Sequence, residues 1–236
     1  PGTLHWQFPV IIDNMMNLEL LCRATEFSGD KSFYDMAISH ADKTMENHFR
    51  PDYSCYHVVN YDTISGNALQ KCTWQGYSDE SVWSRGQSWA LYGYTMMYRE
   101  TKQPRYLEQA KHIAGFLLNH PKMPQDKIPY WDFDDPKVPD ALRDASAAAI
   151  MASALLELSG YVDKVTGQGY IAVAETQLRT LASDEYLAKP GENCNFILKH
   201  SVGFLPQNSE VDVPLTYADY YFVEALMRYR AMHLKE

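Results

Sequence analysis

The segment from Arg85 to His120 reads RGQSWALYGYTMMYRETKQPRYLEQAKHIAGFLLNH. Apolar residues recur in it every three or four positions, as they do along one face of an α-helix. A short polar turn that ends at Pro104 interrupts this pattern, and a second helical pattern begins directly at the proline. The segment therefore predicts two helices joined by a tight turn.

The same two-helix unit recurs along the chain. It occurs in three blocks: residues 14–49, 85–120 and 143–183. The second helix of each block is predicted to open on an aromatic residue: Tyr34, Tyr106 and Tyr170. In the third block this places the start of the helix at Gly169. No convincing run of strands separates the blocks. Such a repeat predicts an all-α fold of stacked helical hairpins, arranged as a solenoid or as a closed ring.

A fourth block, residues 217–236, predicts one helix without a partner. With it the chain has about seven helices, which we assign to a single domain over residues 1–236. An apolar helix face left open to water is unfavourable. We therefore expect the missing partner helices to lie in an N-terminal segment or on another chain.

Three long loops connect the blocks. They are rich in Trp, Tyr, Asp, Gly and Pro and cover residues 50–83, 121–142 and 184–216. All three fall between helical hairpins, so a ring of hairpins would gather them on one face. Long loops on a rigid scaffold are where functional sites usually lie.

The composition limits the classes of partner. The chain has 236 residues, 46% of them apolar, and a formal net charge of −9. It has no run of about 18 apolar residues, so no membrane span is predicted. No block of Lys or Arg stands out, which argues against nucleic acid as a partner. The four cysteines are far apart and the histidines form no ligand pattern, so we predict buried or free thiols and no metal site.

Asp13 follows the apolar run FPVII and precedes a predicted helix. An acidic residue in this place is typical of a helix N-cap. A second interpretation is a carboxyl group at the inner end of a barrel helix, with a pKa that apolar neighbours raise towards general acid catalysis. The local sequence leaves both interpretations open.

Arg85 lies between two tryptophans. If a helix starts near Ser84, then Arg85 and Trp89 are four residues apart and share one helix face, and Trp83 lies just outside the helix. A guanidinium suits a carboxylate, and a tryptophan ring suits the C–H face of a sugar. The simpler interpretation is amphipathic packing, with the arginine reaching solvent.

Other polar residues of the loops are ambiguous. His57 and Gln75 lie in the first loop, where a surface or structural role is the simpler interpretation. The acidic residues of the other two loops are either turn formers or pocket lining: Asp132, Asp134, Asp135, Glu210 and Asp212. No motif for nucleotide binding or serine hydrolase chemistry is present.

Four stretches together resemble the unsaturated glucuronyl hydrolases of glycoside hydrolase family 88. They run through nearly the whole chain in the family's order: IIDNMMNLELL, QGYSDESVWSRGQSWALYGY, PYWDFDDP with RDASAAAI, and HSVGFLPQNSEVDVPLTYADYYFVEAL. The Trp-Ser-Arg-Gly-Gln block that begins at Trp83 is the most specific. The related unsaturated rhamnogalacturonyl hydrolases share the fold, but their equivalents of these stretches read differently.

The resemblance implies an (α/α)6 barrel of six helical hairpins, from which this chain lacks the N-terminal helices. It implies a glycosidase that releases 4,5-unsaturated uronic acid from the non-reducing end of oligosaccharides that lyases produce, here of the glycosaminoglycan type. The reaction hydrates a vinyl ether and needs no metal or organic cofactor.

The resemblance also implies roles for residues. Asp13 matches the acid/base position, and four residues match substrate-contacting positions, with Trp83 close by: His57, Gln75, Arg85 and Trp89. The family's second important Asp lies upstream and has no counterpart here, which puts the activity of the isolated chain in doubt. Two alternatives remain open: an unsaturated rhamnogalacturonyl hydrolase, and a helical-repeat carbohydrate-binding protein without catalysis.

Overall fold

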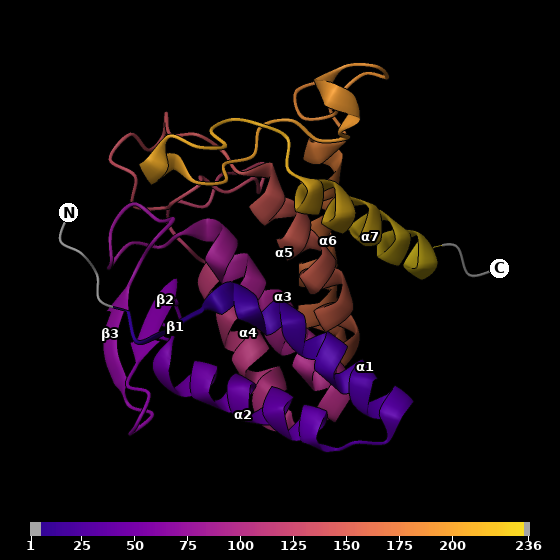
Figure 1. The fold of residues 1–236 in the computed structure, drawn as a ribbon. Helices are drawn as coiled ribbons and strands as arrows, with labels where there is room; N and C mark the ends of the chain where they lie inside the picture. The colour runs from indigo at the N-terminus through magenta and orange to yellow at the C-terminus, as the bar shows by residue number, and fades with distance from the viewer. Residues whose placement is uncertain (1–5, 234–236) are drawn as a thin grey trace.

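The computed structural model describes residues 6–233. Seven α-helices lie in this part of the chain (Figure 1): α1 Leu18–Ser28, α2 Ser32–Asn47, α3 Ser84–Thr101, α4 Pro104–Leu118, α5 Ala145–Leu158, α6 Lys164–Leu181 and α7 Thr216–His233. Short 3-10 helices accompany them, of which η1, Ile12–Asn17, leads into α1. The predicted helical repeat and its unpaired last helix are thus confirmed.

The helices form two rows. An inner row packs in the order α1, α3, α5 and α7, while α2, α4 and α6 each lie against the inner helix that precedes them in sequence (Figure 1). Helix α5 is buried on all sides, and its run of alanines from Ala147 to Ala149 lets α3 and α7 approach closely. The core of the molecule therefore lies around α3 and α5.

The inner helices α3, α5 and α7 start close together, on the same side of the molecule. Arg85 near the start of α3 contacts Asp144, the N-cap of α5, and the ring of Tyr217 at the start of α7 lies 5.5 Å from the Arg85 guanidinium. The connecting loops meet here as well, because the backbone of Ser84 binds that of Trp131. The predicted gathering of the long loops at one place is confirmed.

The prediction of no strands was wrong. A three-stranded antiparallel sheet, ordered β1-β2-β3, consists of β1 Phe8–Ile11, β2 Val58–Tyr61 and β3 Ala68–Cys72. Val10 pairs with Val59 and Val59 with Lys71. The strands are too short to show a clear alternation, and the partner of β1 lies about fifty residues away in sequence. The sheet fixes the segment that leads into η1.

The predicted start of the sixth helix at Gly169 was also wrong. Helix α6 begins at Lys164, because the Asp163 side chain accepts hydrogen bonds from the backbone N–H groups of Val165 and Thr166. Tyr170 therefore lies inside the helix and does not open it. A side chain at Gly167 would overlap the backbone carbonyl of Ser159, so a glycine is needed for this close packing.

Both ends of the inner row expose apolar side chains. On α1, Leu20 and Phe27 are 72% and 89% exposed, and on α7, Tyr220 and Met227 are 60% and 67% exposed. These residues lie on faces that no other helix between residues 6 and 233 covers. Within the same residues, no helix combines the length and apolar character that a membrane span requires.

Candidate active site

Asp13 lies in the first turn of η1, directly after β1. The N-cap position of η1 is held by Ile11 and that of α1 by Asn17, and the Asp13 side chain makes no capping hydrogen bond. The N-cap interpretation of Asp13 was therefore wrong. The side chain is a quarter exposed, but Oδ2 is fully buried and has no hydrogen-bond partner among the residues that the structure describes. An unpaired buried oxygen is unfavourable and calls for a functional explanation.

Burial raises the pKa of Asp13 from 3.8 to about 6. The positive charge of Arg85, the backbone of Asp13 itself and the Trp89 side chain act in the opposite direction, but they do not overcome burial. A carboxyl group with this pKa exchanges a proton near neutral pH, as a general acid must.

His57 on the loop before β2 holds a defined tautomer. Its Nδ1 accepts hydrogen bonds from the backbone N–H groups of Trp74 and Gln75, both at 3.1 Å. Burial, helped by the charge of Arg85, lowers the pKa of His57 to about 3, so the ring is neutral and its proton lies on Nε2. That nitrogen lies 3.6 Å from Asp13 Oδ2. His57 therefore points an N–H donor at the unpaired carboxyl oxygen.

Arg85 is buried and directs its guanidinium at the protein itself. Nη1 binds Asp144 Oδ2 at 3.0 Å and the backbone carbonyl of Val202, and Nη2 binds the carbonyl of Gly203 at 2.7 Å. Nη2 also donates to Gln75 Oε1 at 3.3 Å. The arginine is an anchor between α3, α5 and the 202–203 segment, so the interpretation of a side chain that reaches solvent was wrong.

The bond from Arg85 orients the amide of Gln75. Because Oε1 accepts this hydrogen bond, the amide NH2 group points away from Arg85. Gln75 lines an open cleft of about 490 Å³ next to Asp13, with His57 and the following residues: Trp6, Pro9, Ile11, Asn14, Val58 and Trp74. The cleft thus offers the amide donors of Gln75 and Asn14 and the indole of Trp74, which is 48% exposed.

Trp83 and Trp89 are buried and do not line this cleft. Trp83 packs between the His57 ring, at 4.4 Å, and the Arg85 guanidinium, at 4.6 Å. A side chain at Gly86 would overlap the Trp83 ring, which explains the glycine in this motif. Trp89 packs edge-on against Tyr217 and Tyr221 and interacts with Asp13. As predicted, α3 starts at Ser84, so Arg85 and Trp89 project from the same face.

Comparison with known proteins gives a family. Residues 5–221 match the model of Glycosyl Hydrolase Family 88. The chain belongs to this family.

Its relatives in family 88 are longer than this chain. The chain is 54% identical to the unsaturated glucuronyl hydrolase of Formosa agariphila over 98% of its own length and 57% of the relative's. It is 34% identical to the unsaturated chondroitin disaccharide hydrolase of Streptococcus pyogenes serotype M1, over 94% of its own length and 55% of the relative's. The crystal structure of an unsaturated glucuronyl hydrolase specific for heparin matches it with a TM-score of 0.95 and 59% identity. The match covers 98% of this chain and 62% of the chain in the crystal structure.

These matches confirm the predicted fold. Structures of family 88 proteins are (α/α)6 barrels, and the two rows of helices in this chain are part of such a barrel. The chain spans little more than half the length of the relatives that it matches.

The acidic loop residues that the sequence left open as turn formers or pocket lining do not line the cleft in this family 88 chain. Asp132 is buried and accepts hydrogen bonds from the backbone of Tyr77 and the Ser81 hydroxyl, so it holds the loop before α3. Asp134 accepts from the backbone of Val82, and Asp135 from the indole of Trp131. Glu210 and Asp212 are exposed and lie on the loop before α7, where Asp212 contacts His200 Nδ1.

Sequence reasoning missed three residues of the site. Asn14 and Trp74 line the cleft, and Asp144 holds Arg85 from behind. Asp144 had a signal, since an Asp directly before the helical run ASAAAI is typical of an N-cap. Nothing in the local sequence marks the other two. Among residues 6–233, His, Cys, Asp and Glu side chains form no group that resembles a metal site.

Proposed function

We propose that this chain carries the acid site of an unsaturated glucuronyl hydrolase, in which Asp13 is the general acid and base. The substrate is an oligosaccharide of the glycosaminoglycan type that ends in a 4,5-unsaturated uronic acid. The observation that carries the proposal is the carboxyl group of Asp13: it lies beside the cleft-lining residues His57 and Asn14, its Oδ2 has no hydrogen-bond partner within residues 6–233, and its pKa is about 6. Membership of family 88 and the names of the relatives support the reaction class.

The chemistry needs one group that gives and then takes a proton. Neutral Asp13 donates a proton to C4 of the vinyl ether, and positive charge develops at C5 and the ring oxygen. Water then adds at C5 and loses a proton to the Asp13 carboxylate, which restores the acid. The hemiketal opens and the sugar is released. With a pKa of about 6, roughly a tenth of Asp13 is protonated at pH 7, so the acid form is accessible.

Neutral donors serve the bound sugar on this side of the cleft. None of the eight residues that line it in the described part of the chain is Lys or Arg. Asn14 and the oriented amide of Gln75 offer N–H groups to the uronate carboxylate and hydroxyls, and Trp74 offers an apolar face. His57 stabilises the Asp13 carboxylate after proton transfer, because its Nε2–H faces Oδ2.

We further propose that additional helices of the full-length protein cover the exposed faces of α1 and α7 and close the barrel. The apolar side chains on these faces, such as Phe27 and Met227, support this proposal, as does the greater length of the relatives. The opposite wall of the cleft and the family's second Asp would come from this part. Activity is therefore expected of the full-length protein.

The test is an assay of the full-length protein on unsaturated disaccharides from heparin, chondroitin and rhamnogalacturonan. Turnover removes the conjugated double bond, so the near-ultraviolet absorbance of the unsaturated uronate falls. We expect turnover of the heparin or chondroitin products. Turnover of the rhamnogalacturonan product alone would indicate the related pectin-degrading activity, and binding without turnover would indicate a carbohydrate-binding protein.

A further inference from the structure

Behind the cleft, Arg85 and Asp144 form an ion pair that solvent does not reach. The arginine is 2% exposed and the aspartate 0%, and Nη1 lies 3.0 Å from Oδ2. The other carboxylate oxygen of Asp144 accepts hydrogen bonds from the backbone N–H of Ser146, at 3.0 Å, and from the Ser146 hydroxyl. The start of α5 therefore fixes this carboxylate independently of Arg85.

The remaining hydrogen-bond partners of Arg85 are dipoles and not charges. They are the backbone carbonyls of Val202 and Gly203 and the amide oxygen of Gln75. Within residues 6–233, Asp144 is the one carboxylate that forms an ion pair with Arg85. Because a buried charge without a counter-ion is strongly unfavourable, this pair keeps the guanidinium in place.

The neighbours of Asp13 make the charge of Arg85 important. The groups that act on Asp13 or face it are Arg85 on α3, His57 before β2, Cys55 and Tyr217 at the start of α7. Burial keeps His57, Cys55 and Tyr217 neutral near pH 7, since it lowers the pKa of the first and raises those of the others. Helices α1 and α2 contribute none of the described groups that act on Asp13. Arg85 is thus the one cation among these neighbours.

We propose that Asp144 is a positioning residue, which acts through Arg85: it cancels the positive charge behind Asp13 and holds the guanidinium that orients Gln75. The inference rests on the proposed function, in which Asp13 is the acid. If Asp144 lost its charge, the field of Arg85 at Asp13 would favour the carboxylate, and less of the acid form would be available. The same change would loosen the guanidinium from the side opposite Gln75.

The experiment measures the pKa of Asp13 directly, by NMR titration of the full-length protein with carboxyl-labelled aspartate. The Asp13→Asn variant assigns the signal. Asp144→Asn keeps the N-cap of α5 and removes the charge, and we expect it to lower the pKa of Asp13 from about 6 to about 5. The matched control is Asp132→Asn, a buried carboxyl group with no arginine partner, which should leave the pKa of Asp13 unchanged.

A second pair of variants covers the case in which Asp144→Asn does not fold. Arg85→Met should raise the pKa of Asp13, because it removes the cation and leaves Asp144 as a buried anion. Arg85→Met/Asp144→Asn removes both charges and should bring the pKa back close to that of the unmodified protein. The proposal is overturned if Asp144→Asn leaves the pKa of Asp13 unchanged, either in the protein that keeps Arg85 or in the Arg85→Met variant.

The kinetic readout separates this inference from the proposed function. In the active enzyme, Asp144→Asn should shift the basic limb of the kcat profile to lower pH by the same amount as the pKa, which a loss of folded protein alone would not do. The NMR titration needs no substrate. If the pKa responds as expected but no unsaturated disaccharide is turned over, the proposed function fails and the charge pairing stands.

Discussion

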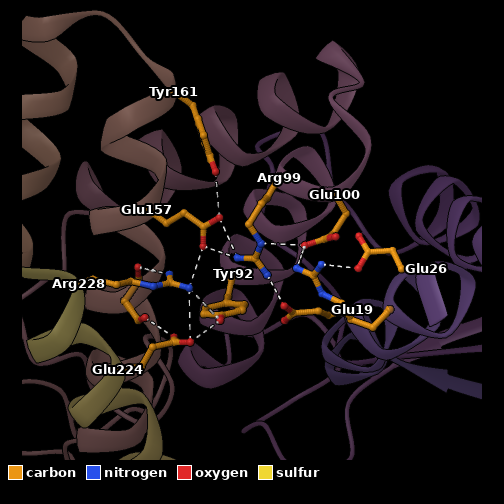
Figure 2. Close-up of polar contacts among 11 residues, drawn as sticks. Glu19, Glu26, Tyr92, Arg99, Glu100, Glu157, Tyr161, Glu224 and Arg228 are labelled. Carbon is orange, nitrogen blue, oxygen red and sulfur yellow. Dashed lines mark hydrogen bonds and ion pairs between the residues drawn. The ribbon is translucent and has the colours of Figure 1, made fainter. Parts of the chain in front are cut away.

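The inner helices hold two clusters of charge, a buried one around Arg85 and a partly buried one around Arg99. The two arginines lie 14 residues apart on α3, about 21 Å along the helix axis. In the second cluster each charge has partners (Figure 2): Arg99 contacts Glu19 at 2.7 Å, Glu100 at 2.9 Å and Glu157 at 2.7 Å. In the first cluster Arg85 is fully paired, but among residues 6–233 Oδ2 of Asp13 has no hydrogen-bond partner.

Under the proposed function, this difference separates a structural cluster from a functional one. Around Arg99, the carboxylates come from α1, α3 and α5, and Arg228 of α7 joins through Glu157 at 2.9 Å, so the cluster ties together all four inner helices (Figure 2). Around Arg85, Oδ2 of Asp13 has no hydrogen-bond partner in the described part of the chain, and His57, which faces it, lines an open cleft. An unsatisfied buried group costs stability and persists where function needs it.

The largest expected effect is on turnover. Asp13→Asn in the full-length enzyme should lower kcat by about 10² to 10⁴-fold, the usual contribution of a general acid, while the unsaturated disaccharide still binds. Steady-state kinetics and calorimetric titration of the substrate measure the two quantities. Retained turnover would remove Asp13 from the mechanism and with it the functional half of the comparison.

The second prediction concerns stability. Arg99→Met leaves several partly buried carboxylates without their cation, and we expect a loss of about 2 to 3 kcal/mol in the free energy of unfolding. Urea denaturation followed by circular dichroism measures it. The control is Lys111→Met, which removes an exposed pair with Glu108 and should cost under about 0.5 kcal/mol. Equal effects of the two substitutions would show that the Arg99 cluster has no special structural role.

The third prediction concerns the pH dependence of stability. The folded pKa of Asp13 is about 6 against 3.8 in the unfolded chain, so the folded state binds the proton more tightly. The destabilisation by the buried carboxylate is absent below pH 3.8 and grows as the pH rises to 6. Asp13→Asn should therefore stabilise the protein by about 1 to 3 kcal/mol at pH 7 and by nothing below pH 4, as thermal unfolding at both pH values would show. A gain that does not depend on pH would contradict the raised pKa.

The smallest expected effect tests the tautomer of His57. His57→Gln keeps an N–H donor near the position of Nε2, whereas His57→Asn keeps an acceptor for the backbone of Trp74 and Gln75 and loses the donor to Asp13. We expect kcat/KM of the Asn variant to fall about tenfold below that of the Gln variant, in line with one hydrogen bond. The reverse order would show that anchoring of the loop is the more important role.

The helices could be predicted because their signals are local. The start of α3 at Ser84 and the pairing of helices follow from apolar spacing and turn residues within a few positions. The sheet and the start of α6 were missed for opposite reasons. Strand β1 depends on a partner about fifty residues away, while the cap Asp163 was overlooked beside a more conspicuous glycine.

The site could be predicted in composition but not in geometry. His57 and Gln75 line one cleft, and Asp13 lies 3.6 Å from His57, but the roles of the Trp83 to Trp89 block depend on distant partners. Arg85 is held by carbonyls 117 and 118 residues further along the chain, and any residue type can supply a backbone carbonyl. No motif reveals such a contact, so a buried anchor and a ligand-binding arginine look alike in the sequence.

The common direction of the inner helices has one more consequence. Each α-helix carries a partial positive charge, about half an elementary charge, at its first turn, where several backbone N–H groups lack partners. Helices α3, α5 and α7 bring these turns together beside the cleft, in a protein whose formal net charge is −9. This acidic protein thereby gains a local attraction for anions from peptide dipoles, although no Lys or Arg among the described residues lines the cleft. This attraction acts over a few ångströms, so it favours an anion already at the entrance and does little to draw one from bulk solution.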